Sequence, residues 1–284
     1  MERFAMKHFV SLGLVAIVAA LAGDLSGSLV PDRKAPDENA PPKHFINSIG
    51  IKFAWIPPGT FMMGSPKEEK GRELLQGANE THHQVKLTKG FYMGVHLVTQ
   101  EQWQVVMGNN PSHFKGRKDL PVESVSWDDC QEFVKKLRKR DNKPYRLPSE
   151  AEWEFCCRAG TTTPFYFGAT ISTDLANYDG RCAYGDGKKG MYREKTTPVG
   201  SFPSNAWGLY DMHGNLFQWC QDWIEDYPQN DVVDPQGPKE GQGRVFRGGS
   251  WGSSPQDCHS AFRLGNVPGC STYCIGFRPC YFVE

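Results

Sequence analysis

The chain has 284 residues, and its 32 basic and 32 acidic side chains leave no formal net charge. Such a balance provides no field to gather nucleic acid or anionic lipid, so we expect neither as a partner. Hydrophobic residues make up 39% of the chain, enough for a substantial core, while 30 glycines and 20 prolines predict extensive irregular backbone.

The N-terminus predicts export. Two basic residues precede an apolar run at 9–22, which is shorter than a membrane span and typical of a signal peptide at residues 1–22. A lipoprotein signal is the alternative, but Asp24 stands where that signal would carry its acylated cysteine. We therefore expect a protein at the cell surface, in the periplasm or secreted. It would associate with a membrane only if this segment were retained or lipidated.

A flexible linker and then one folded domain follow. Residues 23–45 are rich in proline and charged residues, which is typical of a flexible linker, and the domain is expected over residues 46–284. A short strand is predicted at 53–56, closed by a Pro-Pro-Gly turn. Thr99 with Gln102 and Ser149 with Glu152 form capping boxes that predict helices ending near Gly108 and Gly160, and a third apolar helical face begins after Ser126.

Common catalytic and metal-binding motifs are not found in the sequence. The eight histidines are scattered, and there is no GxSxG elbow, phosphate loop or HExxH. Nine cysteines in an exported chain is an odd number, so at least one lacks a partner within the chain.

The most unusual segment lies near the C-terminus, within a variable region at about 248–280. The words RVFRGGSW and IGFR bracket residues 252–274, which show neither helical nor strand periodicity. Lys, Glu, Gln, Met and Trp make up 62 of the 284 residues, yet only Gln256 represents them in this segment of 23 residues. These five types cannot be reached when both adenines of an asparagine codon are randomised. The composition therefore indicates adenine-directed diversification.

The ordered words IPPGTFMMGS, VTQEQWQVVMG, YRLPSEAEWEFCCRAGT, LYDMHGNLFQW and RVFRGGSW resemble the formylglycine-generating enzyme (sulfatase-modifying factor) family. The likeness runs from about residue 50 to the end of the sequence. It implies an α+β fold, a variant of the C-type lectin fold with few regular elements and long ordered loops.

This resemblance also implies metal positions. The two copper-binding cysteines of the family fall at Ser253 and Cys258, and a serine hydroxyl cannot replace a thiolate for copper(I), so copper is not expected. If the chain were a copper-dependent oxidase of this family, Cys258 would be its one catalytic candidate. A structural calcium site would use Asp211, Gly214, Leu216 and Gln218, and a second would use Asn177 and the carbonyl of Tyr178, although its aspartate has no clear match in this sequence. Gln218 departs from the family's usual Glu, and Asp211 and Asn215 could instead only satisfy turn amides.

The C-terminal segment is similar to the variable region of proteins diversified by retroelements, several of which use this lectin-type fold. That resemblance implies a non-catalytic binding protein whose ligand is a protein or glycan on another cell or surface. The candidate variable, ligand-binding positions are Gly252, Ser253, Ser254, Asp257, His259, Phe262, Leu264, Gly265, Asn266, Val267, Gly269, Cys270, Ser271, Thr272, Tyr273 and Cys274.

Different roles are expected within this region. Tyr273, Phe262 and Leu264 are the expected anchors for the ligand, because large apolar groups supply most contact energy. Three framework arginines are expected to hold the loops through forked hydrogen bonds, namely Arg247, Arg263 and Arg278. Cys270 and Cys274 are either products of variation or a disulfide pair.

Overall fold

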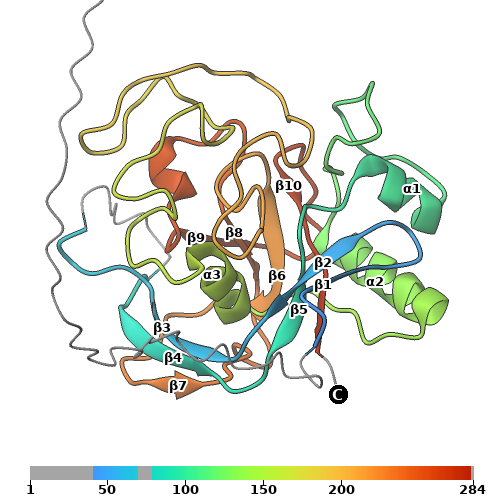
Figure 1. The fold of residues 1–284 in the computed structure, drawn as a ribbon, viewed down its shortest axis with the longest axis horizontal. Helices are drawn as coiled ribbons and strands as arrows, with labels where there is room; N and C mark the ends of the chain where they lie inside the picture. Colours follow the sequence, from blue (N-terminus) through green and yellow to red (C-terminus); the bar gives the residue numbers. More distant parts are fainter. Residues whose placement is uncertain (1–40, 70–78, 283–284) are drawn as a thin grey trace, which may run out of the picture. The chain divides into compact units, whose positions relative to one another are not determined.

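The computed structural model describes residues 41–69 and 79–282. The predicted export signal and most of the predicted linker therefore lie outside the described residues. Within these ranges the chain forms three α-helices and eleven short strands in three sheets, which confirms the α+β class (Figure 1). No helix in the described part is long and apolar enough to span a bilayer.

The helices begin where their capping residues predict. Each N-cap side chain, from Thr99, Ser126 or Ser149, accepts a hydrogen bond from the backbone three residues on, and that residue's side chain accepts one from the N-cap backbone. The stop predicted at Gly160 comes one residue earlier, because Ala159 already adopts the left-handed conformation. The helices are α1 (Gln100–Met107), α2 (Trp127–Asp141) and α3 (Glu150–Arg158).

The first sheet joins the two ends of the domain. Its strands, in the order β1-β2-β5-β11, are β1 (His44–Ile46), β2 (Lys52–Ile56), β5 (Phe91–Gly94) and β11 (Cys280–Phe282). Strand β1 begins inside the segment predicted as linker, because Phe45 stacks on Phe53 with ring centroids 4.8 Å apart. The ordered domain thus starts a few residues before the predicted boundary at 46.

The second sheet carries the C-terminal segment. It has the order β10-β6-β8-β9, with β10 (Ile275–Gly276), β6 (Phe217–Trp223), β8 (Arg244–Arg247) and β9 (Arg263–Asn266). The segment 252–274 lacks a periodic pattern, yet it contains both β9 and the 3₁₀-helix η1 (Pro255–Cys258). Strand β9 forms because main-chain hydrogen bonds to β8, from Arg247↔Arg263 to Arg244↔Asn266, do not depend on the exposed side chains.

Long ordered loops complete the domain. A third sheet of β3 (Gly59–Met63), β4 (His83–Leu87) and β7 (Val232–Val233) packs near α3 (Figure 1). From residue 160 to 216 the backbone forms turns and isolated bridges, with no helix or full strand. Helix α3 is buried along its whole length, so it serves as the central support for these loops.

Candidate binding face

A groove lies over the second sheet, beside the segment 252–274. Its volume is about 860 Å³, within the range of pockets that hold small ligands or side chains. Seven of the sixteen predicted variable positions line it, namely Gly252, Ser253, Asp257, Phe262, Leu264, Tyr273 and Cys274. The other lining residues are Tyr192, Phe217, Ser250 and Trp251. The structure thus brings together positions that are up to 22 residues apart in the sequence.

The remaining nine predicted positions lie outside the groove lining. Exposed members lie at the end of β9 and in the turn that follows it, namely Gly265, Asn266, Val267, Gly269 and Ser271. Ser254, Cys270 and Thr272 are partly buried, whereas His259 is buried. All nine cysteines are free thiols in the structure, so Cys270 and Cys274 form no disulfide there.

Stacked aromatic rings form one side of the groove. Trp251 stacks against Tyr273 with centroids 5.9 Å apart and against Tyr192 at 6.1 Å. The indole of Trp251 also donates a hydrogen bond of 3.1 Å to the Tyr273 carbonyl, which fixes its orientation. Tyr273 itself is half exposed, so its ring can meet a ligand. Sequence reasoning missed Tyr192, because nothing in its local pattern connects it to a segment sixty residues later.

The two other expected anchors differ from Tyr273. Phe262 is only 5% exposed and belongs to the main hydrophobic core, where it packs near Phe217. Leu264 is partly buried and packs against the same core. Phe262 is therefore part of the groove wall, and Tyr273 is the one expected anchor with a largely free surface.

The groove is supported from behind by buried ion pairs. The Arg247 guanidinium is fully buried and donates to Glu150 at 2.6 Å, to Glu154, and to the Ser260 carbonyl at 2.7 Å. Arg263 is bidentate to Glu150, with both distances 2.7 Å. Because a buried charge is costly unless it is paired, this network holds η1 and β9 in one arrangement over α3.

Arg278 supports the neighbouring strands. It donates to the carbonyls of Gly94 and Tyr210 at 3.0 and 2.7 Å. The predicted structural role of the three arginines is confirmed, but their partners were only partly foreseen. The sequence pattern did not single out Glu150 and Glu154, although two acids one turn apart on a helix were an available signal.

A buried histidine ties η1 to another loop. The Nε2 atom of His259 lies 3.2 Å from the Glu80 carboxylate, and its Nδ1 faces the carbonyl of Gln256. Both partners are acceptors, so both ring nitrogens must donate, which is the pattern of a protonated imidazole. Burial opposes this charge, but the Glu80 hydrogen bond and charge raise the pKa of His259 above 6.5.

We expect stability to fall as the pH rises above 6.5. The pKa of His259 is higher in the folded state, so its contribution is complete below 6.5 and disappears as the pH passes the folded pKa. Asp222, whose pKa is raised to about 8 mainly by burial, acts in the same direction. Melting temperatures of wild type and His259→Gln, measured between pH 6 and pH 9, separate the contribution of His259 from that of Asp222. If the melting temperature of the variant changed with pH as steeply as that of wild type, this role for His259 would be contradicted.

Residues 47–281 match the family model of the sulfatase-modifying factor enzyme 1-like domain. The chain belongs to this family. It is 34% identical over 178 residues to the formylglycine-generating enzyme of Streptomyces coelicolor, covering 59% of this chain and 54% of that enzyme. It is 36% identical over 257 residues to the serine/threonine-protein kinase pkn1 of Chlamydia caviae, covering 80% of this chain and 37% of the kinase. The chain thus spans from about a third to about half of these relatives.

Two solved structures share nearly the whole domain. Treponema denticola variable protein 1 matches with a TM-score of 0.71 and 28% identity, covering 85% of this chain and 99% of that one. PvdO from Pseudomonas aeruginosa matches with a TM-score of 0.70 and 29% identity, covering 84% and 98%. The predicted lectin-like fold of the sulfatase-modifying factor family is confirmed, as is the resemblance to a variable protein.

The copper position of the sulfatase-modifying factor family holds a poor donor set in this chain. The Ser253 hydroxyl accepts a hydrogen bond of 3.0 Å from the Ser250 amide. Cys258 is fully buried, and burial raises the pKa of its thiol well above 9. Cys258 Sγ lies so close to Gly249 that a Cβ built there would be only 2.4 Å away. A hydroxyl and a buried protonated thiol do not fit copper(I), which favours thiolates.

The first calcium position of the family also fits poorly. Gln218 Oε1 already accepts hydrogen bonds from Trp153 at 2.9 Å and Arg278 at 2.6 Å, which use both of its lone pairs. The Asp211 carboxylate accepts the Gly200 amide at 2.9 Å, and the Gly214 carbonyl accepts the Leu216 amide at 3.0 Å. These contacts favour the alternative in which this loop satisfies its own turn amides.

The second position fits a hard cation better. The Asn177 side-chain oxygen and the Thr196 and Thr197 hydroxyls are buried without hydrogen-bond partners in the described part of the chain. Asn177 and Thr197 lie close together, because Asn215 Oδ1 accepts from both the Asn177 side-chain amide and the Thr197 backbone. An amide oxygen without a hydrogen-bond partner is a group that calcium binds, although the described residues hold no cluster of three or more carboxylate, histidine or cysteine side chains suited to a metal. The carbonyl of Tyr178, the next residue, belongs to the same predicted site.

Proposed function

We propose that the protein is an exported ligand-binding protein that presents a diversified groove on a lectin-like scaffold. The observation that carries this proposal is the separation of the predicted variable positions from the buried charges that support them. Twelve of the sixteen predicted variable positions line the groove or lie exposed beside it, while the charges of Arg247, Glu150 and Glu154 are buried behind. A binding surface can tolerate change only when other residues fix its backbone.

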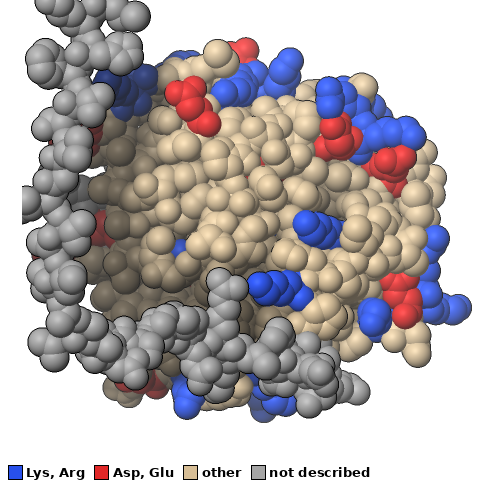
Figure 2. Space-filling view, viewed as in Figure 1, with Lys and Arg blue, Asp and Glu red and all other residues tan. Residues whose placement is uncertain are grey.

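The proposed ligand is a protein or glycan on another cell or surface. The rings of Tyr192 and Tyr273, which stack on the buried Trp251, offer flat apolar surface, and Asp257 offers a carboxylate beside it. Figure 2 shows one face of the domain as mostly uncharged, with acidic and basic side chains interspersed near its edge. That face has no broad basic patch of the kind that binds nucleic acid.

A display experiment tests whether the groove can be diversified. Codons at the partly or fully exposed positions Gly252, Asp257, Leu264 and Tyr273 would be replaced by asparagine codons with both adenines randomised. Folded clones would then be selected for binding to immobilised lysozyme. We expect folded binders to be recovered. In a control library, randomised Ser253, His259 and Phe262 should yield few folded clones, because these side chains are buried. A first library without folded clones would contradict the proposal.

Calcium at the second family position is part of the proposal, with Asn177 and Tyr178 as ligands. Calcium that binds only the folded state must raise the melting temperature. We expect millimolar Ca²⁺ to raise it in wild type, chelator to reverse this rise, and Asn177→Ala to abolish it. An equal rise in the variant would place calcium elsewhere.

The alternative function is an oxidase like the formylglycine-generating relatives. It is favoured only by family membership, since Ser253 and the buried Cys258 give an unsuitable copper position. Incubating the purified protein with copper and a sulfatase-type cysteine peptide tests this alternative. Formylglycine in the peptide would reverse the ranking of the two functions.

A further inference from the structure

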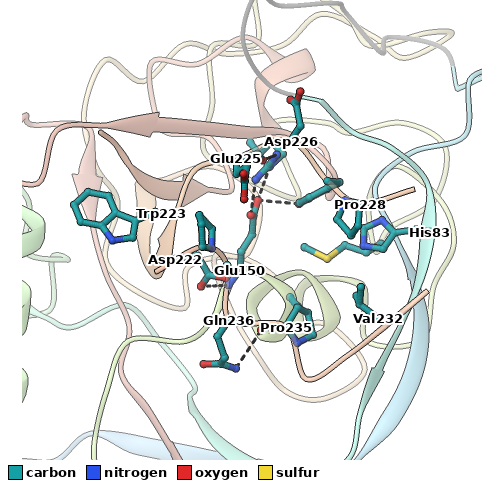
Figure 3. Close-up of a pocket in the computed structure, with 16 residues that line it drawn as sticks. His83, Glu150, Asp222, Trp223, Glu225, Asp226, Pro228, Val232, Pro235 and Gln236 are labelled. Carbon is teal, nitrogen blue, oxygen red and sulfur yellow. Dashed lines mark hydrogen bonds and ion pairs between the residues drawn. The ribbon is translucent and has the colours of Figure 1, made fainter. Parts of the chain in front are cut away.

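A second cavity of about 490 Å³ shares no lining residue with the groove. It is enclosed by the end of β6, the first turn of α3, strand β4 and the loop at 235–238 (Figure 3). In Figure 3 the Asp222 carboxyl lies beside Glu150, while His83 and Val232 lie on the other side of the view. Its volume is sufficient for a small organic group.

The cavity has an excess of negative charge. The Glu150 carboxylate is neutralised by Arg247 and Arg263. Asp222, Glu225 and Asp226 also line the cavity, and no ion pair within residues 41–69 and 79–282 involves them.

The one arginine in the lining cannot balance this charge. Arg263 already donates to Glu150 and to the carbonyls of Asn79 and Glu225, and its guanidinium lies 3.8 Å from the Tyr227 ring centre. A ligand that enters this space therefore meets unpaired carboxyl groups and no free arginine.

Asp222 is the buried member of the acidic set. It is 5% exposed, and its Oδ2 accepts a hydrogen bond of 2.8 Å from the Glu150 amide. Its Oδ1 has no hydrogen-bond partner in the described part of the chain. A buried carboxylate in this state favours either a proton or a cation. Burial, assisted by the charge of Glu150, raises the pKa of Asp222 to about 8.

The rest of the lining suits an alkyl chain and a second hydrogen bond. Met63, Val232, Pro235 and Pro238 provide apolar surface. His83 donates from Nδ1 to the Thr81 carbonyl at 2.9 Å, which leaves its Nε2 as an acceptor without a partner in the described residues. An ammonium group has three N–H donors, of which one can reach the Asp222 carboxyl, while His83 offers an acceptor on the other side of the cavity.

Other cations fit less well. A quaternary ammonium ion needs open aromatic faces, but guanidinium groups already cover the Tyr227 and Trp223 rings, the latter through Arg244 at 3.5 Å. A divalent metal ion needs several converging oxygens, whereas Glu225 and Asp226 are exposed at the rim.

We propose that this cavity binds a primary alkylammonium group, with the ammonium on Asp222 and the alkyl chain against the Val232 and Pro235 side. The group could belong to a free diamine or to a lysine side chain of a partner. Because binding a cation favours the ionised carboxyl, a proton leaves Asp222 on binding at neutral pH, and affinity rises with pH. The site is independent of the groove proposed above.

Calorimetric titration of the full chain with cadaverine tests this site, with 1-pentanol and pentanoate as neutral and anionic controls. We expect cadaverine to bind at least about tenfold tighter than either control, the usual effect of one charge-assisted hydrogen bond. Nα-acetyl-lysine methylamide distinguishes the two sources: binding equal to cadaverine indicates a lysine side chain, and weaker binding a free amine. For wild type, affinity should increase between pH 7 and pH 8.5.

Three variants make the test specific. Asp222→Asn keeps the shape and the bond from the Glu150 amide, so it should weaken cadaverine at least about tenfold and remove the pH dependence. Glu240→Gln, an exposed acid outside the cavity, should leave binding unchanged. If Asp222→Asn does not fold, the double rim variant Glu225→Gln with Asp226→Asn should weaken binding severalfold. Equal binding of 1-pentanol and cadaverine, or unchanged affinity in the cavity variants, would overturn the proposal.

Discussion

Replacing Arg247 with methionine is expected to lower the free energy of unfolding by about 3–5 kcal/mol, the usual cost of removing one partner from a buried ion pair. The side chain is fully buried, and its loss removes the pairing of Glu154 Oε2 and one of the partners of Glu150. It also releases the Ser260 carbonyl, next to η1. Urea denaturation of the full chain measures the change.

Two further variants define the origin of this effect. Arg117→Met removes an exposed arginine paired with Asp119 and should leave the unfolding midpoint nearly unchanged. Adding Glu154→Gln to Arg247→Met should cost less than the sum of the single changes, because the first change already deprives Glu154 of one of its two arginine partners. A loss below about 1 kcal/mol for Arg247→Met would show that the buried network does not support the groove.

Phe262→Ala is expected to destabilise the protein by about 3–5 kcal/mol, whereas Tyr273→Ala should cost about 1 kcal/mol or less. Both residues line the groove and both belong to the predicted variable set. However, Phe262 is 5% exposed in the core and Tyr273 is 50% exposed. Truncating the first leaves a cavity, and truncating the second removes the contacts of a half-exposed ring with Trp251, His113 and Phe114.

The Phe262→Ala and Tyr273→Ala variants compare a buried variable position with an exposed one. If diversification is limited by stability, natural variants should change at Tyr273 freely and retain a large apolar residue at 262. Chemical denaturation of the two variants measures the difference. Equal costs would mean that exposure does not control which positions tolerate change.

Local signals in the sequence predicted the helices well, because a capping box is decided by residues three positions apart. Thr99, Ser126 and Ser149 could therefore be read directly. Strand β9 could not, since its hydrogen bonds to β8 are made by main-chain groups that leave no mark on side-chain periodicity.

The site was predicted in part for the same reason. The segment 252–274 was identified by its residue types, which are those obtained when the adenines of an asparagine codon are randomised. These types did not show that His259 turns inward to Glu80 while Tyr273 turns outward. Orientation depends on contacts between distant segments, such as Glu80 with a residue 179 positions later. The family resemblance supplied the fold and the copper alignment, and the structure supplied the burial of Cys258.

The groove is proposed to be a surface whose side chains are diversified at the level of the gene. Sequencing the genomic DNA downstream of the gene tests it most directly. We expect a near-copy of the segment encoding about residues 248–280, a neighbouring reverse transcriptase gene, and mismatches confined to adenines of the copy. Those mismatches should fall mainly on exposed positions such as Gly252, Asn266 and Tyr273, and rarely on Phe262. If no such repeat is present, or mismatches fall on all four bases alike, the diversified binding face is contradicted.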